Sequence, residues 1–226
     1  MKQSARDVFV EFTSKFEGVV PWMYLDVEGL VTVAIGNLID PIGAALGLPF
    51  VHKGTTTPAT SEEIATEWTM VKNHPTAAKQ GHLVLQTVTQ LRLTPDGVEK
   101  VVSDRLAINE SILRKRFPGY DDWPADAQLA TNSMAWANGP YFRFPQLAAA
   151  LLAGDFATAA DTCHIDDRNN PGVTPRNAAD RELYLLAARA VTEGLEPEEL
   201  FYNESGRPTA DQLMQSAPIV HPEVLS

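Results

Sequence analysis

The sequence predicts an α+β fold in which one short hairpin is combined with a majority of helices. Apolar residues recur at helical spacing over residues 3–17, and two strand-like segments follow at 22–26 and 30–35. Most of the second half of the chain again has helical character. The expected organisation is a small lobe over residues 1–93, a connecting helix over 94–116, a mainly helical larger lobe over 117–193 and a C-terminal extension over 194–226.

The first helix is predicted over residues 3–17, with an apolar face made by Ala5, Val8, Phe9, Phe12 and Phe16. Gly18 suits the position that ends a helix. Glu17 is therefore expected at the negative end of the helix dipole, where the field opposes ionisation of a carboxylate. Phe16 and Trp22 are near enough in sequence to add an apolar surround. We expect these effects to raise the pKa of Glu17, as a general acid requires.

A β-hairpin is predicted over residues 22–35, with a three-residue turn that ends at Gly29. In that register Thr32 faces Tyr24. Side chains alternate along a strand, so Asp26, Tyr24 and Thr32 are expected on one face of the hairpin. A shift of one residue would move Thr32 to the opposite face, so the arrangement depends on the length of the turn.

The middle of the chain gives weaker signals. Residues 40–59 are rich in proline, glycine and threonine and are expected to form a long loop or an extension of the small lobe. Thr60 and Glu63 form a capping box for a helix through about Val71. Residues 73–93 contain strand-like stretches and stay ambiguous.

A long helix is predicted from Thr94-Pro95 to about Arg116, because threonine is a good N-cap and proline suits the first helical position. Further helices are expected over residues 124–137, 145–153, 155–163 and 175–193. Residues 194–226 contain four prolines and a run of acids, and are expected to form an extension without catalytic residues.

Composition excludes several classes of protein. The chain has 226 residues and a net charge of −11, which disfavours nucleic-acid binding and gives no long-range attraction to anionic polymers. Its single cysteine, Cys163, excludes an internal disulfide and is expected to be buried. We expect no membrane span, because there is no run of 18 apolar residues, and the N-terminus lacks the apolar core of a signal peptide.

Metal and cofactor motifs are absent from the sequence. There is no HExxH, CxxC, GxSxG or phosphate loop. The histidines, at positions 52, 74, 82, 164 and 221, have no ligand spacing, and the adjacent residues 163–167 are poorly placed to converge on one ion. No metal and no cofactor are therefore expected.

Glu17, Asp26 and Thr32 together suit the hydrolysis of a glycosidic bond. One acid protonates the leaving oxygen, the other carboxylate prepares a water, and a short polar side chain holds that water. Taken singly, Glu17 is an ordinary helix-end acid, Asp26 a turn residue and Thr32 a strand residue. The joint spacing, rather than any one of these residues, favours catalysis.

Residues 17–36 read E-G-x5-Y-x-D-x-E-G-x2-T-x2-I-G. This segment resembles the catalytic segment of the T-even phage lysozymes, glycoside hydrolase family 24. The resemblance implies a lysozyme-like fold with a cleft between two lobes. It also implies a muramidase that cleaves the β-1,4 bond between N-acetylmuramic acid and N-acetylglucosamine with inversion and without a cofactor. Glu17 would be the general acid, while Asp26 and Thr32 position the water. Inversion predicts carboxyl groups ~6.5–9.5 Å apart.

Other positions are assigned only by this resemblance. Leu38 and Trp136 match residues that line the family's cleft, although a core role for Trp136 stays open. Gly36 is expected to allow close backbone approach at the cleft floor. Asn37 departs from the family, which usually has a histidine there. The segment at about 40–93 is longer than in the family.

The resemblance implies bacterial peptidoglycan as the partner of a monomeric enzyme. Such an enzyme would be made in the bacterial cytoplasm and would act on the wall in the periplasm or outside the cell. It would be a phage lysin, a virion-associated lysozyme or an antibacterial effector, and its acidic surface suits a basic inhibitor or immunity protein. Two alternatives stay open: an inactive lysozyme-like module that binds peptidoglycan or a partner, and an interaction protein that binds through the segment at 40–93.

Overall fold

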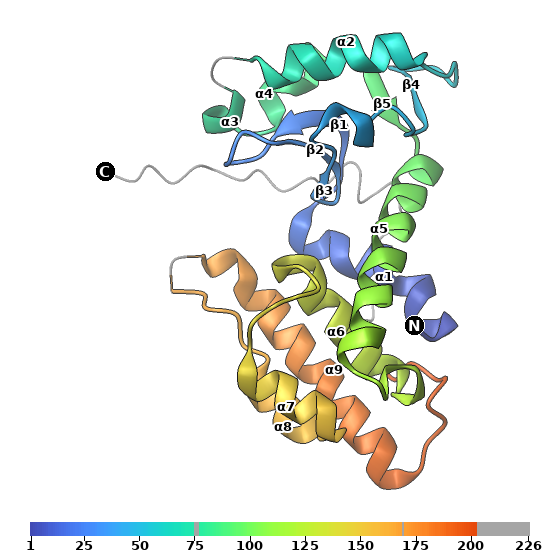
Figure 1. Cartoon of the computed structure of the whole chain (residues 1–226), viewed down its shortest axis with the longest axis vertical. Coiled ribbons are helices and arrows are strands. Elements are labelled where there is room, and N and C mark those ends of the chain that lie inside the picture. The colour runs from blue at the N-terminus through green and yellow to red at the C-terminus, as the bar shows by residue number, and fades with distance from the viewer. Residues whose placement is uncertain (75–76, 169, 203–226) are drawn as a thin grey trace. The chain divides into compact units, whose positions relative to one another are not determined.

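The computed structural model describes residues 1–74, 77–168 and 170–202, and its chain course is shown in Figure 1. It combines a majority of helices with two small antiparallel sheets, which confirms the α+β class. The described residues divide into two compact units: Glu17–Asp104 forms the hairpin unit, and Met1–Phe16 with residues 105–202 forms the helical unit. The first helix therefore groups with the later helices, and not with the small lobe as expected.

The hairpin unit contains a three-stranded sheet in the order β1-β2-β3. Its strands are β1 (Val20–Leu25), β2 (Val31–Ala34) and β3 (Asn37–Leu38). Tyr24 pairs with Thr32, which confirms the predicted register of the hairpin.

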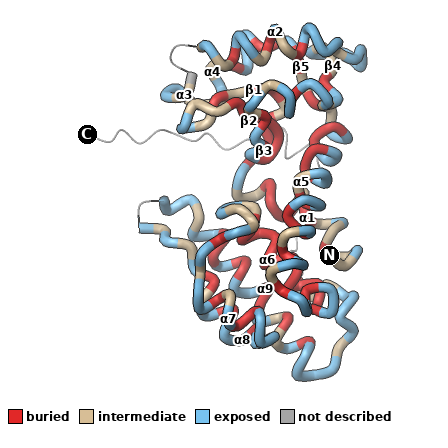
Figure 2. The backbone as a smooth tube through the Cα atoms, in the orientation of Figure 1, coloured by how far each residue is buried: buried red, intermediate tan, exposed pale blue. Residues whose placement is uncertain are grey.

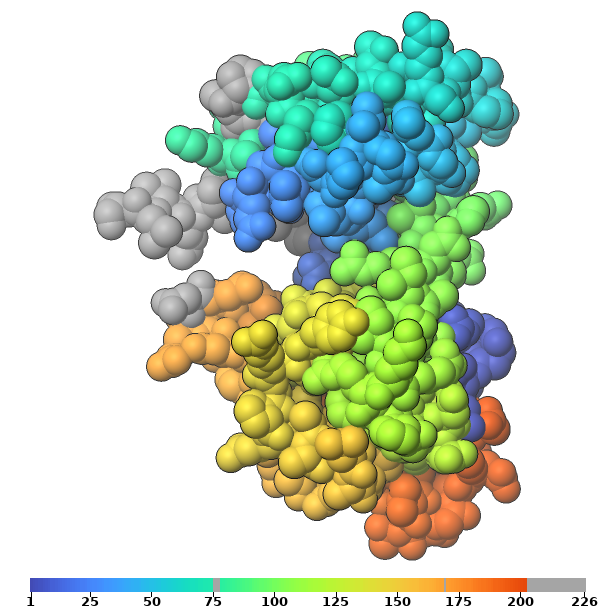
Figure 3. Space-filling model, in the orientation of Figure 1, coloured from blue at the N-terminus to red at the C-terminus, as the bar shows by residue number. Residues whose placement is uncertain are grey.

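Residues 40–59, expected to form a loop or an extension of the small lobe, and residues 73–93, which stayed ambiguous, contain short helices and strands. Helix α2 (Ser61–Lys72) lies between them in sequence. The other elements are η1 (Ile42–Ala44), β4 (Phe50–His52), α3 (Ala77–Gln80), α4 (Leu83–Gln86) and β5 (Leu91–Leu93). β4 pairs antiparallel with β5, and the predicted capping box begins α2. The strand-like stretch at 83–86 is a short helix instead, and only residues 91–93 find a strand partner. Helix α2 lies on the surface of this unit (Figure 3).

The helical unit begins with α1 (Gln3–Glu17), as predicted, and α5 (Pro95–Arg116) runs from the hairpin unit into it. The other elements are η2 (Tyr120–Asp122), α6 (Ala125–Asn138), α7 (Pro145–Ala153), α8 (Phe156–Thr162), η3 (Pro171–Val173) and α9 (Thr174–Glu193). The predicted helices are confirmed to within one residue at each end. Every residue of α6 from Ala125 to Ala135 is buried, so α6 is the centre of this core (Figure 2).

One buried cation of this core has clear partners. Arg176 at the start of α9 is 1% exposed, donates to the Ser133 hydroxyl at 3.0 Å, and lies over the ring of Phe16. Cys163 is buried and free, as predicted.

The chain after α9 returns to α6. The Asp126 carboxylate accepts hydrogen bonds from the N–H groups of Phe201 and Tyr202 at 3.1 and 2.9 Å. The rest of the expected extension, residues 203–226, lies outside the described residues. Among the helices that the structure describes, none is long and apolar enough to span a membrane.

Candidate functional site

One face of the three-stranded sheet carries three predicted site residues and a tyrosine of the motif. We call it the hairpin face, and its residues are Tyr24, Asp26, Thr32 and Leu38. Tyr24 pairs with Thr32 across β1 and β2, and Thr32 pairs with Leu38 across β2 and β3. Directly paired residues share a face, and side chains two apart along a strand point the same way. Asp26, two residues beyond Tyr24, therefore belongs to this face, as the sequence predicted.

Asp26 closes the hairpin turn with its own carboxylate. Its Oδ1 accepts hydrogen bonds from the N–H groups of Glu28 and Leu30, both at 2.9 Å. The N–H of Gly29 donates to the Asp26 carbonyl at 3.0 Å, and Gly29 has a φ of 75°, as expected for the left-handed position. Oδ2 accepts no hydrogen bond from any described residue. The turn thus fixes the direction of the carboxylate and leaves one oxygen for another ligand.

Thr32 is 4% exposed, and its Oγ1 donates to the Leu30 carbonyl at 3.3 Å. A hydroxyl that donates its proton in this way keeps its lone pairs as acceptors. Thr32 can therefore accept a hydrogen bond from a water on the hairpin face.

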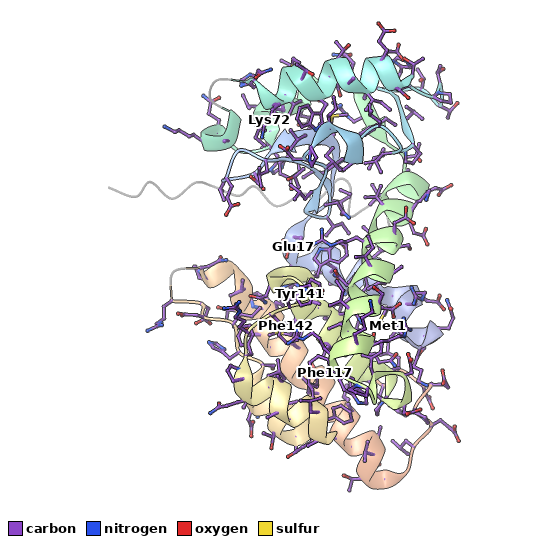
Figure 4. The ribbon with its side chains drawn as sticks, viewed as in Figure 1. Met1, Glu17, Lys72, Phe117, Tyr141 and Phe142 are labelled. Carbon is purple, nitrogen blue, oxygen red and sulfur yellow. The ribbon has the colours of Figure 1, made fainter. Side chains whose placement is uncertain are left out.

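Glu17 is the last residue of α1, as predicted, and Gly18 follows it with a φ of 71° (Figure 4). Its side chain is exposed, so the expected apolar surround from Phe16 and Trp22 is wrong. The Phe16 ring packs under the Arg176 guanidinium at 4.8 Å, while the Trp22 ring packs under Arg92 at 5.3 Å. Both rings are held in cation–π contacts by the fold.

Tyr24 is a partly buried phenol of the hairpin face. Its pKa is raised well above the ordinary value, first by burial of the phenol and then by the negative charges of Glu17 and Asp26. The ring of His82, from the segment before α4, lies 6.0 Å from the Tyr24 ring. In the sequence, Tyr24 was indicated by the motif and by the predicted register of the hairpin.

The predicted substrate-binding residues differ in their placement. Leu38 is 44% exposed beside Thr32, where an apolar side chain is available to a ligand. Gly36 has a φ of 70° and open space where a Cβ would lie, so conformation and not close approach explains this glycine. Trp136 belongs to the helical unit, where its ring meets the edge of Phe9 at 5.3 Å and the guanidinium of Arg105 at 6.0 Å. Trp136 and the hairpin face therefore belong to different units.

Asn37, where the phage lysozymes usually have a histidine, has a structural role in this protein. It is 4% exposed, its Nδ2 donates to the Val101 carbonyl at 3.3 Å, and its Oδ1 accepts from the Ile35 N–H at 3.3 Å. The bond to Val101 fastens the first residue of β3 to α5.

A surface depression beside α2 carries several acids near the exposed side chains of Met70 and Val88. Two of these acids stabilise the fold. Glu63 accepts from the Thr60 N–H at 2.7 Å, and Glu67 accepts from the Leu91 N–H at 3.1 Å. Binding of a basic partner here stays a prediction. Among the described residues, no group of histidine, cysteine, aspartate and glutamate is arranged to hold a metal ion.

No family model and no curated protein matches the sequence of this chain. The resemblance to the phage lysozymes therefore depends on the sequence itself, chiefly on the motif at residues 17–36.

Proposed function

We propose that this protein is a muramidase with a lysozyme-like fold, which hydrolyses the β-1,4 bond between N-acetylmuramic acid and N-acetylglucosamine in bacterial peptidoglycan. The observation that carries the proposal is the geometry of the hairpin: Tyr24 pairs with Thr32, and the adjoining turn holds Asp26 Oδ1 through the N–H groups of Glu28 and Leu30. Asp26 and Thr32 are two residues that the proposed mechanism uses, and the third, Glu17, ends α1 shortly before β1. The substrate implies action on the bacterial wall, in the periplasm or outside the cell.

In the proposed reaction, Glu17 donates its proton to the glycosidic oxygen, which leaves with the electrons of the broken C–O bond. Its exposure gives a polymeric substrate access to this carboxyl. A water held by Thr32 Oγ1 and Asp26 Oδ2 attacks the anomeric carbon from the opposite side. The water's proton passes to Asp26, and the configuration is inverted.

Tyr24 contributes to the electrostatics of this proposed site. A phenol is neutral at neutral pH, and the raised pKa of Tyr24 extends this neutrality to higher pH, so Tyr24 adds no negative charge to the site. A neutral hydroxyl can also donate a hydrogen bond to a carboxylate or to a sugar.

The test is digestion of purified peptidoglycan with mass analysis of the products. The wild-type protein should release fragments with reducing muramic acid ends. Glu17→Gln should lower the rate by roughly 10²–10⁴-fold, because it removes the general acid. Asp26→Asn should also abolish most of the activity.

Glu28→Gln is the matched control, because Glu28 is an exposed acid in the hairpin turn that Asp26 closes. It should retain activity within about twofold, since it is outside the proposed chemistry. Unchanged lysis by Glu17→Gln would refute the assignment of the acid, and anhydro ends would identify a lytic transglycosylase instead.

A non-catalytic peptidoglycan-binding module is the second candidate. It is favoured by the structural hydrogen bonds that Asp26 and Thr32 both make within the hairpin. Sedimentation of the protein with insoluble peptidoglycan, without release of reducing ends, would support this alternative.

A further inference from the structure

Helix α2 is fastened to the hairpin turn by its last residue. Lys72 Nζ donates to the Gly29 carbonyl at 2.9 Å and to Asp40 Oδ2 at 2.6 Å. The same Asp40 oxygen accepts from the Val31 N–H at 3.2 Å. The ammonium therefore joins the turn to Asp40, in the segment that leaves β3, and Asp40 in turn holds the first residue of β2. Lys72 is labelled in Figure 4.

These hydrogen bonds are charge-assisted and partly shielded from water. The side chains of Lys72 and Asp40 are 32% and 16% exposed. The hydrogen bond from Lys72 is the main cause of the lowered pKa of Asp40, so the Asp40 carboxylate is ionised at neutral pH. Charge-assisted bonds are stronger than neutral ones, and a neutral side chain at position 72 would not replace them.

The clamped turn is the same turn that orients Asp26. Asp26 Oδ1 is held by the N–H groups of Glu28 and Leu30, the residues on either side of Gly29. A shift of the Gly29 carbonyl rotates the adjoining peptide groups, because each carbonyl is rigidly coupled to the next N–H across a planar peptide bond. The N–H that follows the Gly29 carbonyl is that of Leu30. Lys72 thus acts on the direction of the Asp26 carboxylate through one peptide group.

We propose that Lys72 is a positioning residue that holds the Asp26 turn in its working geometry. Its catalytic consequence rests on the proposed muramidase function, whereas its effect on the turn does not. The inference gives a role to the segment at 40–93, in which α2 supports the hairpin from outside.

The test compares Lys72→Met, which keeps most of the aliphatic stem and removes the ammonium, with the wild-type protein. Amide hydrogen exchange at Glu28 and Leu30 should accelerate by about tenfold, because opening of the turn no longer breaks a charge-assisted bond. With peptidoglycan as substrate, kcat should fall by about tenfold and KM should stay within about twofold, as expected for lost positioning. Lys72→Arg should show slower amide exchange and a higher kcat than Lys72→Met, because arginine keeps a charged donor.

Lys100→Met is the matched control. Lys100 lies in the same unit, in an exposed pair with Asp104 at 2.9 Å, so its loss should change neither exchange at Leu30 nor kcat. If Lys72→Met unfolds, Lys72→Gln is measured in the same way, since its amide ends one bond short of the ammonium position.

Three outcomes separate the inference from the proposed function. Unchanged exchange at Glu28 and Leu30 in a folded Lys72 variant would overturn the clamp. Faster exchange with an unchanged kcat would overturn its positioning role. A wild-type protein that releases no sugar would overturn the muramidase, and the exchange data would still decide the clamp.

Discussion

At the scale of single residues, Gly29 shows how backbone conformation alone can determine which amino acid a position favours. Its φ is 75°, and the space that a Cβ would occupy is open. A side chain there would meet no neighbour but would strain the left-handed backbone. The same turn holds the Asp26 carboxylate, so this local requirement reaches the proposed chemistry.

Gly29→Ala should therefore lower the free energy of unfolding by about 1 kcal/mol, through strain at a positive φ. Denaturation with urea measures this change. Gly43→Ala is the control, because Gly43 also has open space around it but no positive φ. It should be neutral or stabilising by up to about 1 kcal/mol. Equal losses in the two variants would contradict the explanation.

At the scale of elements, α6 anchors the chain that follows α9. Asp126 in the first turn of α6 is completely buried, and its carboxylate accepts two backbone N–H groups from Phe201 and Tyr202. Burial raises the pKa of Asp126 to about 6, although these hydrogen bonds oppose the shift. A buried carboxylate is therefore used as a connection between two segments far apart in sequence.

The raised pKa of Asp126 predicts a pH dependence of stability. Between about pH 4, its unfolded pKa, and pH 6, the folded state binds more protons than the unfolded state. The contribution of Asp126 to the free energy of unfolding should therefore decrease as pH rises through this window, by up to about 3 kcal/mol.

Denaturation of the wild type and of Asp126→Asn at several pH values tests this expectation. As pH rises from about 4 to 6, the wild type should lose stability relative to Asp126→Asn, because only the wild type carries the titrating carboxyl. Asp104→Asn serves as a control, because that side chain is 62% exposed and should give no such trend. Parallel curves for the wild type and Asp126→Asn would contradict the assignment.

At the scale of the whole molecule, the net charge of −11 sets the long-range interaction with the proposed substrate. Peptidoglycan and its attached polymers are often anionic, so attraction at a distance is absent or reversed. Affinity must then come from short-range contacts such as those available to Leu38 on the hairpin face. This differs from charge-steered binding, in which added salt slows association.

Lysis of whole cells should therefore depend weakly on salt, or accelerate, between about 0.01 M and 0.1 M NaCl, as the Debye length falls from about 30 to 10 Å. Turbidity assays at fixed pH measure this rate. Peptidoglycan stripped of its anionic polymers is the control and should show a smaller effect. A steep loss of activity with added salt would argue for attraction and against this expectation.

The sequence by itself determined the features that depend on neighbouring residues. The end of α1 at Glu17 and Gly18, the capping box at Thr60 and the register of Tyr24 with Thr32 were all predicted. Caps and tight turns are set by a few adjacent residues, whose hydrogen bonds and allowed dihedrals are local. The shared face of Asp26 and Thr32 could be predicted for the same reason, because the length of one turn sets the register of the hairpin.

Only the tertiary structure decided the features that depend on distant residues. Strand β4 pairs with β5 some forty positions later, Lys72 reaches Gly29, and α1 groups with helices beyond Arg105. The exposure of Glu17 also could not be predicted, because the nearby aromatic rings pack under arginines from other elements. Such contacts carry no local pattern: they form where the folded chain brings charge and apolar surface together, and not where the sequence is adjacent.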